Sequence, residues 1–362
     1  TISGSEVIET TSKTSYNGNY GLNASWTIYN GSKRLNTIKQ EKLNNQAANL
    51  DVETSENSIQ ESIAQIYIQI LYAAESVKVN ENTLQVSIAQ RDRGQELLNA
   101  GSIAKSDLAQ LEAQVSTDRY QLVTAQATLQ DYKLQLKQLL ELDGENEMNV
   151  YLPALSDENV LLPLPTKKDV YMSALTLRPE IEASKLSVEA SELGIDIAKA
   201  GYLPTISLSA GIGTNHTSGS DFTFGEQVKN GWNNSIGVSV SVPIFNNRQT
   251  KSAVQKAKLQ RETSLLSLLD EQKTLYKTIE GLWLDANSAQ QRYAAANEKL
   301  KSTQISYDLI SEQFNLGMKN TVELLTEKNN LLQAQQEQLQ AKYMAILNTQ
   351  LLKFYQGDKL AL

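Results

Sequence analysis

The sequence predicts a mainly α-helical protein that also carries antiparallel strands of the transmembrane β-barrel type, arranged as two internal repeats. The first observation is a gapless self-alignment, in which Tyr20–Tyr29 matches Ile236–Phe245 and Asn99–Gly101 matches Asn315–Gly317 at one offset. The second is a set of three segments in which apolar and small polar residues alternate, and the third is a pair of very long proline-free segments. Each repeat is therefore predicted to contain a strand, a long helix, a tight tip and a returning helix.

The strand prediction rests on three alternating segments. Each has one apolar face and one face of Ser, Thr, Asn or Gly, the period-two pattern of a strand between two environments. This alternation fits a soluble β-sandwich as well as a membrane barrel. The apolar faces are Leu22, Ala24, Trp26 and Ile28; Ile206, Leu208, Ala210 and Ile212; and Ile236, Val238, Val240, Val242 and Ile244.

Two details favour the membrane barrel over the sandwich. The polar faces carry no charge, which suits a wide aqueous lumen. Aromatic residues also gather at the segment ends, and such rings prefer the two interfaces of a bilayer. They are Tyr20 and Trp232 at one level, and Tyr29, Tyr202 and Phe245 at the other.

A polar loop is predicted over Thr214–Asn233, with Thr1–Asn17 as its equivalent in the first repeat. His216 lies in this loop and is interpreted as a solvated residue rather than a ligand. Because Thr1 aligns with Thr217, we expect a further N-terminal segment in the natural protein, with a cleaved signal. That segment would supply a helix and a strand equivalent to those predicted around Ala174–Ala200 and over Leu203–Gly213.

Two long helices are predicted over Gly31–Leu98 and Gln249–Leu316, where no proline occurs. At 1.5 Å per residue each would be about 100 Å long, so it must pack sideways against neighbours. An apolar stripe in the first has coiled-coil spacing, which also fits an ordinary coiled-coil rod. The stripe is Ile59, Ile63, Ile66, Ile70, Ala73 and Val77. Gly101 and Gly317 end these helices, and returning helices are predicted over Ser106–Glu141 and Thr321–Tyr355.

The predicted organisation has four parts. Residues 1–141 form the first repeat, with one strand and a helical hairpin, and residues 180–355 form the second, with a helix, two strands and a hairpin. Residues 142–179 form an irregular linker, because four of the chain's six prolines occur there. Residues 356–362 form a C-terminal tail. The four linker prolines are Pro153, Pro163, Pro165 and Pro179.

Composition argues against several classes of function. The net charge of −8 and pI near 5.0 oppose nucleic-acid binding, which needs a basic face. With no cysteine and one histidine, the chain offers no thiolate or histidine-rich metal site and no nucleophile–base set, so we expect no metal, no cofactor and no enzyme activity. No stretch approaches the roughly 20 apolar residues of a transmembrane helix.

Several motifs resemble those of the TolC-type outer-membrane channel family. They are SVPIFNNRQTKSAVQKA at Ser241–Ala257, GYLPTISLSAGIG at Gly201–Gly213, and the tip sequences LLNAGSIAKSDLAQLEA and QFNLGMKNTVELLTEKN. The resemblance covers nearly the whole chain. It implies a homotrimer whose strands share one β-barrel and whose helices continue the tube as a periplasmic α-barrel that closes at the tips.

The resemblance also implies gate residues at the tips. Asp107 occupies the acidic position of the first tip, while Phe314, Lys319 and Glu323 occupy the aromatic, basic and acidic positions of the second. A further acidic position falls at Thr326, which is uncharged. Lys319–Asp107-type pairs across helices could hold the tips shut. Two alternatives stay open: Asp107 and Glu323 could be first-turn acids favoured by the helix dipole, and Phe314 could be a packing residue.

The function implied is the outer-membrane channel of a tripartite efflux pump, a passive exit duct extending from the outer membrane into the periplasm of a Gram-negative-type bacterium. The expected partners are outer-membrane lipid, an inner-membrane transporter and a periplasmic adaptor that docks near Gly101 and Gly317. Two alternatives remain, the duct of a type I protein secretion system and a coiled-coil scaffold that forms no channel.

Overall fold

The computed structural model describes residues 14–142, 149–153 and 160–360 of the chain. Its internal contacts divide the chain into two compact units. The first is made of Thr1–Gln46 and Lys185–Leu266, and the second of Ala47–Ser184 and Ser267–Leu362. The strands belong to the first unit and the helical tips to the second.

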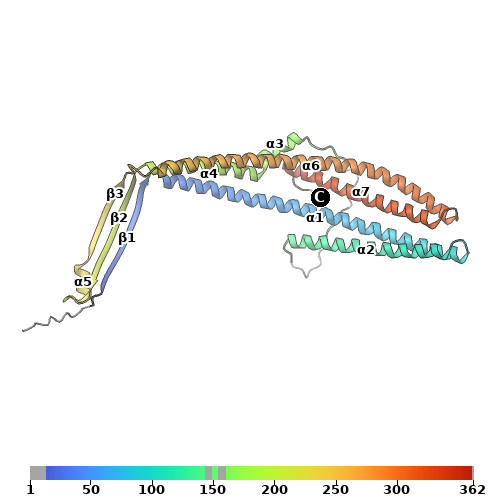
Figure 1. Cartoon of the computed structure of the whole chain (residues 1–362), viewed down its shortest axis with the longest axis horizontal. Helices are drawn as coiled ribbons and strands as arrows, with labels where there is room; N and C mark the ends of the chain where they lie inside the picture. Colours follow the sequence, from blue (N-terminus) through green and yellow to red (C-terminus); the bar gives the residue numbers. More distant parts are fainter. Residues whose placement is uncertain (1–13, 143–148, 154–159, 361–362) are drawn as a thin grey trace, which may run out of the picture. The chain divides into compact units, whose positions relative to one another are not determined.

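The first unit contains an antiparallel sheet of β1 (Asn17–Asn30), β2 (Thr205–Thr217) and β3 (Asn233–Ser241), in that spatial order (Figure 1). The register places apolar residues opposite apolar residues and small polar residues or glycine opposite one another. Leu208 of β2 lies between Trp26 and Val238, and its neighbour Ser209 lies between Ser25 and Gly237. The predicted strands and their two-faced alternation are therefore confirmed.

The apolar face of this sheet is exposed within the chain. Five of its large side chains keep between 61 % and 83 % of their surface accessible. Soluble monomers rarely expose a contiguous group of large apolar side chains. This face therefore needs an apolar partner or an apolar solvent. The five residues are Leu22, Trp26, Ile236, Val238 and Val240.

A β-bulge interrupts the pattern near the end of β1, where the register shifts between Thr27 and Tyr29. Ile28 is the extra residue, and Tyr29 lies opposite Ile206, while the place of Ile28 on the apolar face stays a prediction. A bulge adds one residue and re-aims the side chains that follow. In β3 the predicted strand was also too long, since the strand ends at Ser241.

The predicted loop over Thr214–Asn233 is partly wrong. β2 continues to Thr217, and a short helix, α5 (Phe224–Asn230), follows it. The His216 ring packs edge-on against Phe224 with 5.0 Å between centroids, so His216 is a strand residue rather than a solvated loop residue. Gly, Ser and Asp are frequent in this segment, but Thr223 and Glu226 form a capping box that marks the start of the short helix. Residues 1–13 of the equivalent predicted loop lie outside the described residues.

Each long helix is immediately preceded by two consecutive residues with left-handed backbone. Gly31 and Ser32 (φ 65° and 64°) precede α1 (Lys33–Asn99), and Asn247 and Arg248 (φ 50° and 62°) precede α6 (Gln249–Asn315). At Gly31 an added Cβ would lie 2.8 Å from Leu203 Cβ and 3.0 Å from the Ala200 carbonyl oxygen. Glycine is therefore required there for both conformation and close approach.

Replacement of Gly31 by alanine is expected to destabilise the protein by more than the ~1–2 kcal/mol of a left-handed residue alone. The excess arises because the new methyl group would also meet Leu203 and the backbone of Ala200. Gly219→Ala is the matched control, since Gly219 has φ +82° but nothing within 4 Å of the added Cβ. Thermal unfolding in detergent, followed by circular dichroism, compares the two. Equal losses would show that the close contact at Gly31 is unimportant.

Two helical hairpins lie largely in the second unit. α1 and α2 (Lys105–Leu139) form one, and α6 and α7 (Thr321–Gln356) form the other (Figure 1). α1 and α6 have 67 residues each. The predicted long helices and their returns are therefore confirmed, with ends shifted by one or two residues. None of the helices in the described part of the chain has both the length and the apolar character needed to cross a bilayer.

The hairpins bury more of α1 than the predicted stripe. Ile70 and Ala73 of that stripe are buried, but Ile59 is exposed. Ile68 and Leu71, on another face, belong to a core cluster with residues of α6 and α7. α1 thus contacts neighbours on two faces, as a helix flanked on both sides must.

The helix predicted around Ala174–Ala200 is two helices, α3 (Lys167–Leu177) and α4 (Pro179–Lys199). Arg178 between them has extended backbone (φ −77°, ψ 124°), the conformation favoured before a proline. α3 packs against α7. Residues 143–148 and 154–159 of the predicted linker lie outside the described residues.

The Arg178 side chain forms a buried junction among α1, α4 and α7. Its Nε donates to Glu180 Oε1 at 2.8 Å, and its Nη2 lies 3.4 Å from Glu61 Oε1. The guanidinium carbon lies 4.3 Å from the ring centroid of Tyr355. This junction attaches the break between α3 and α4 to α1 and α7.

Candidate functional site

The two long helices, α1 and α6, end in turns of the same type. These turns form the tips of the two hairpins. Gly101 and Gly317 have φ of 72° and 73°. Their N–H groups donate to the carbonyls of Leu98 and Phe314, each at 2.9 Å, and the next N–H in each turn reaches one residue further back. This is a Schellman motif. An added Cβ would meet nothing within 4 Å at either glycine. Their docking role stays a prediction.

Asp107 stabilises the start of α2. Its Oδ2 accepts a hydrogen bond from the Ala104 N–H at 3.0 Å. Ala104, at the N-cap, has no side-chain oxygen with which to return the bond. The first tip therefore has half of a capping box.

Glu323 makes the complete arrangement at the second tip. Its N–H donates to Asn320 Oδ1 at 2.9 Å, and its Oε2 accepts from the Asn320 N–H at 3.3 Å. Its other oxygen, Oε1, lies 2.6 Å from Lys319 Nζ. The Glu323 carboxylate thus completes the capping box of α7 and also forms an ion pair with Lys319.

These bonds determine how Glu323 responds to pH. The hydrogen bond from Lys319, followed by that from the Asn320 backbone, holds the pKa of Glu323 below its usual 4.5. Because the folded-state pKa is the lower one, the stabilisation is present above about pH 4.5. It is lost as the pH falls through the lowered folded value.

The other predicted gate features are placed differently. No ion pair joins Lys319 and Asp107 within the described chain, since Lys319 pairs with Glu323. Phe314 is only 2 % exposed, which favours its interpretation as a packing residue. Thr326 donates its hydroxyl proton to the Val322 carbonyl at 2.8 Å. The gate roles of Asp107, Phe314, Lys319 and Glu323 stay predictions.

The predicted interface aromatics lie at the two ends of the sheet. Tyr20 and Trp232 are at the end where β2 finishes and β3 begins. Tyr29, Tyr202 and Phe245 are at the opposite end. All five are exposed within the chain. Contact with lipid headgroups stays a prediction.

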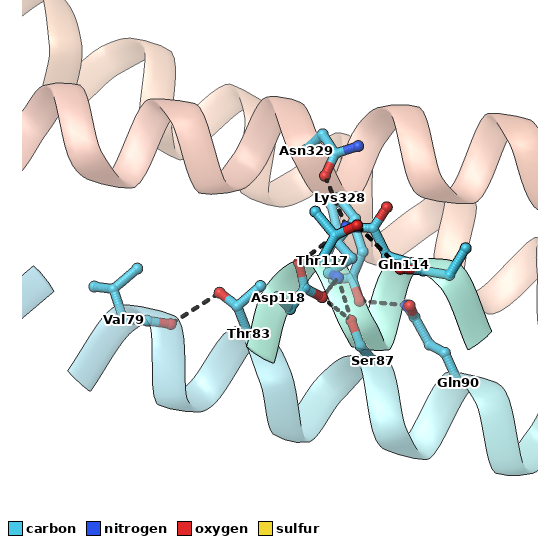
Figure 2. Close-up of polar contacts among 11 residues, drawn as sticks. Val79, Thr83, Ser87, Gln90, Gln114, Thr117, Asp118, Lys328 and Asn329 are labelled. Carbon is cyan, nitrogen blue, oxygen red and sulfur yellow. Dashed lines mark hydrogen bonds and ion pairs between the residues drawn. The ribbon is translucent and has the colours of Figure 1, made fainter. Parts of the chain in front are cut away.

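Figure 2 shows a buried polar cluster that the sequence analysis missed. Lys328 of α7 donates to Asp118 of α2 and to Ser87 of α1, and Ser87 donates to the same Asp118 oxygen, Oδ2. Gln114 Nε2 donates to the other oxygen, Oδ1, at 2.9 Å. The cluster lies two turns into α7 from the second tip.

A signal for this cluster was present in the helical spacing. Lys328 lies four residues after Leu324 and three before Leu331, both of them buried. This is the spacing of one helix face. A charge on an apolar face is expected to need a buried partner, but the sequence does not show that Asp118 is that partner.

Known proteins share this architecture. The model of the family described as "Outer membrane efflux protein" matches residues 1–141 and 170–357. The chain belongs to the outer membrane efflux protein family. Among curated members, the outer membrane efflux protein BepC of Brucella suis is 24 % identical over 333 residues, and the outer membrane protein TolC of Escherichia coli is 25 % identical over 311.

These efflux proteins are longer than the present chain. The matches cover 91 % of this chain and 70 % of BepC, and 82 % of this chain and 60 % of TolC. Among solved structures, that of CusC superimposes with a TM-score of 0.82 at 19 % identity, covering 98 % of this chain and 81 % of CusC. At that identity the similarity to CusC establishes a shared fold.

Proposed function

We propose that the chain is the outer-membrane channel component of a tripartite efflux pump. It is a passive exit duct for small molecules across the outer membrane and periplasm of a Gram-negative-type bacterium. The observation that carries the proposal is the sheet of the first unit, with one face exposed and apolar and the other polar and free of charge. Lipid on one side and water on the other account for both faces.

The sheet also supports a homotrimer. β1 and β3 are its two edge strands in the described chain. In lipid, the free N–H and C=O groups of an edge strand have no partner. A closed barrel that is shared with two further copies leaves no such unpaired edge.

The helices continue the duct as an α-barrel. Their organisation supports two repeats, because α1 and α6 begin and end at one gapless offset and follow equivalent left-handed junctions. Polar side chains of the helices line the water column. Three copies together enclose this water column.

The tips form the gate and the docking site. Asp107 and Glu323 lie in the first turns behind them, and threefold symmetry makes each a ring of carboxylates that attracts cations. A periplasmic adaptor docks around Gly101 and Gly317, where Leu316 and Met318 are exposed. An inner-membrane transporter supplies the energy and selects the cargo.

Conductance across planar bilayers tests this function. The purified full-length protein is expected to form ion-conducting pores, and Glu323→Ala is expected to conduct more because it removes the carboxylate half of the α7 capping box and the Lys319 pair. Asp107→Ala is expected to act in the same direction. Loss of a cap costs about 1 kcal/mol, or roughly fivefold in a local equilibrium.

Glu112→Ala is the matched control. Glu112 is an exposed carboxylate on α2, just beyond Asp107 and outside the cap. It should leave conductance unchanged. If wild type and both tip variants all fail to conduct, the channel function is excluded.

A further inference from the structure

The buried cluster behind the second tip has no part in the duct as described so far. Lys328, Asp118 and Ser87 are each at most 3 % exposed. They come from three different helices, and each bonds to the other two (Figure 2). The cluster therefore joins the hairpin α1–α2 to the hairpin α6–α7.

Burial makes this connection hard to break. Charges removed from water are tolerated only when they are paired and hydrogen-bonded. Both oxygens of Asp118 are bonded, one by Lys328 and Ser87 and the other by Gln114. Burial lowers the pKa of Lys328, while the bond to Asp118 acts in the opposite direction. Separating the helices would leave two buried charges without partners.

Close packing around α7 is incomplete on one side at this level. A pocket of about 110 Å³ lies beside Lys328, with Val79 of α1, Tyr307 of α6 and Leu331 of α7 in its wall. Side chains next to a void have no contact atoms on that side. Apolar packing on this side of α7 is therefore incomplete, and the polar cluster adds a connection between the helices there.

A shift of α7 here would reach the tip. Lys328 and Glu323 belong to the same helix, roughly 7.5 Å apart along its axis. Glu323 is bonded to Asn320 and Lys319 in the turn. Movement of α7 at Lys328 would displace this capped turn as a unit.

We propose that Lys328, Asp118 and Ser87 form a buried latch that positions the second tip. While the latch is closed, α7 stays fixed to the hairpin α1–α2, and the turn with Lys319 and Glu323 cannot move away from it. The gating consequence rests on the proposed channel function, whereas the mechanical role of the latch does not.

Amide hydrogen exchange on the full-length protein in detergent tests the mechanical role. Lys328→Ala leaves Asp118 buried without its cation, so the amides of residues 324–332 are expected to exchange about tenfold faster or more. Asp118→Asn, which leaves Lys328 unpaired, should act in the same direction. Lys301→Ala is the matched control, because Lys301 forms an exposed pair with Glu298 on α6. It should leave the exchange of residues 324–332 unchanged.

Ser87→Ala keeps the experiment decisive if the charge variants do not assemble. It removes one hydroxyl and preserves the ion pair, so an increase of at least about threefold is expected from the two hydrogen bonds lost. Exchange at residues 324–332 that is unchanged in a folded latch variant would overturn the proposal. In bilayers, latch variants should show longer open times than wild type. If wild type forms no pore, the channel function fails, and the exchange rates still decide the latch.

Discussion

Replacement of Arg178 by alanine is expected to lower the free energy of unfolding by about 3–5 kcal/mol, the usual cost of removing one partner from a buried ion pair. The Arg178 side chain is 10 % exposed, and its partners Glu61 and Glu180 are 21 % and 18 % exposed. Without the guanidinium, the largely buried carboxylates of Glu61 and Glu180 lose their shared cation. The loss also removes the cation from the face of the Tyr355 ring.

The same substitution should make stability more sensitive to pH. Burial already raises the pKa of Glu61, and Arg178 opposes that effect. In the variant the folded-state pKa of Glu61 therefore rises further above 4.5. A carboxyl with a raised folded pKa stabilises the protein below its unfolded pKa, and that contribution is lost as the pH rises through the folded value. The deficit of Arg178→Ala should thus be smaller near pH 4.5 than at pH 7.

Arg261→Ala is the matched control for this prediction. Arg261 also pairs with a glutamate, Glu192, at 2.6 Å, but both side chains are substantially exposed. Exposed pairs contribute only about 0–1 kcal/mol. Guanidinium chloride unfolding in detergent, followed by far-UV circular dichroism, measures both variants. Similar losses in the two would mean that the Arg178 junction behaves as a surface pair.

The regular elements were predictable because their causes are local. The alternation of apolar and small polar residues along Ile236–Val240 indicates a strand whose two faces lie in different environments. The absence of proline over residues 249–316 permits one unbroken helix. The glycine at each tip marked the end of a helix, because Gly101 and Gly317 adopt the left-handed conformation that glycine accepts cheaply.

The polar clusters were not predictable, because their causes are distant in the sequence. Lys328 and Asp118 lie in separate halves of the chain, and the default for either charge is a solvated surface. Likewise, the bulge at Ile28 depends on pairing with β2 and leaves no mark in the alternation of β1. At the second tip, the interpretations of Glu323 as a gate residue and as a first-turn acid do not exclude each other. The same carboxylate completes the capping box of α7 in either case.

Replacement of Leu352 by alanine is expected to destabilise the protein by about 2–5 kcal/mol, the range for a large core residue cut back to alanine. Leu352 of α7 is 0 % exposed and belongs to a cluster with Val170 and Ala174 of α3 and Ile279 of α6. Two of the surrounding helices, α6 and α7, are fixed by contacts along their length and are expected to relax little around a cavity. The loss should therefore fall in the upper part of the range.

Leu352→Met tests whether the loss in Leu352→Ala comes from the missing side-chain volume, because methionine has nearly the same volume as leucine. A swap that conserves volume usually costs less than about 1.5 kcal/mol, because methionine can refill an irregular space. The same denaturant titration, applied to both variants, gives the comparison. If Leu352→Ala costs no more than Leu352→Met, the contact between α3 and α7 does not depend on close packing. Its stability would then have to come from the Arg178 junction beside it, and Leu352→Ala combined with Arg178→Ala would lose no more than Arg178→Ala alone.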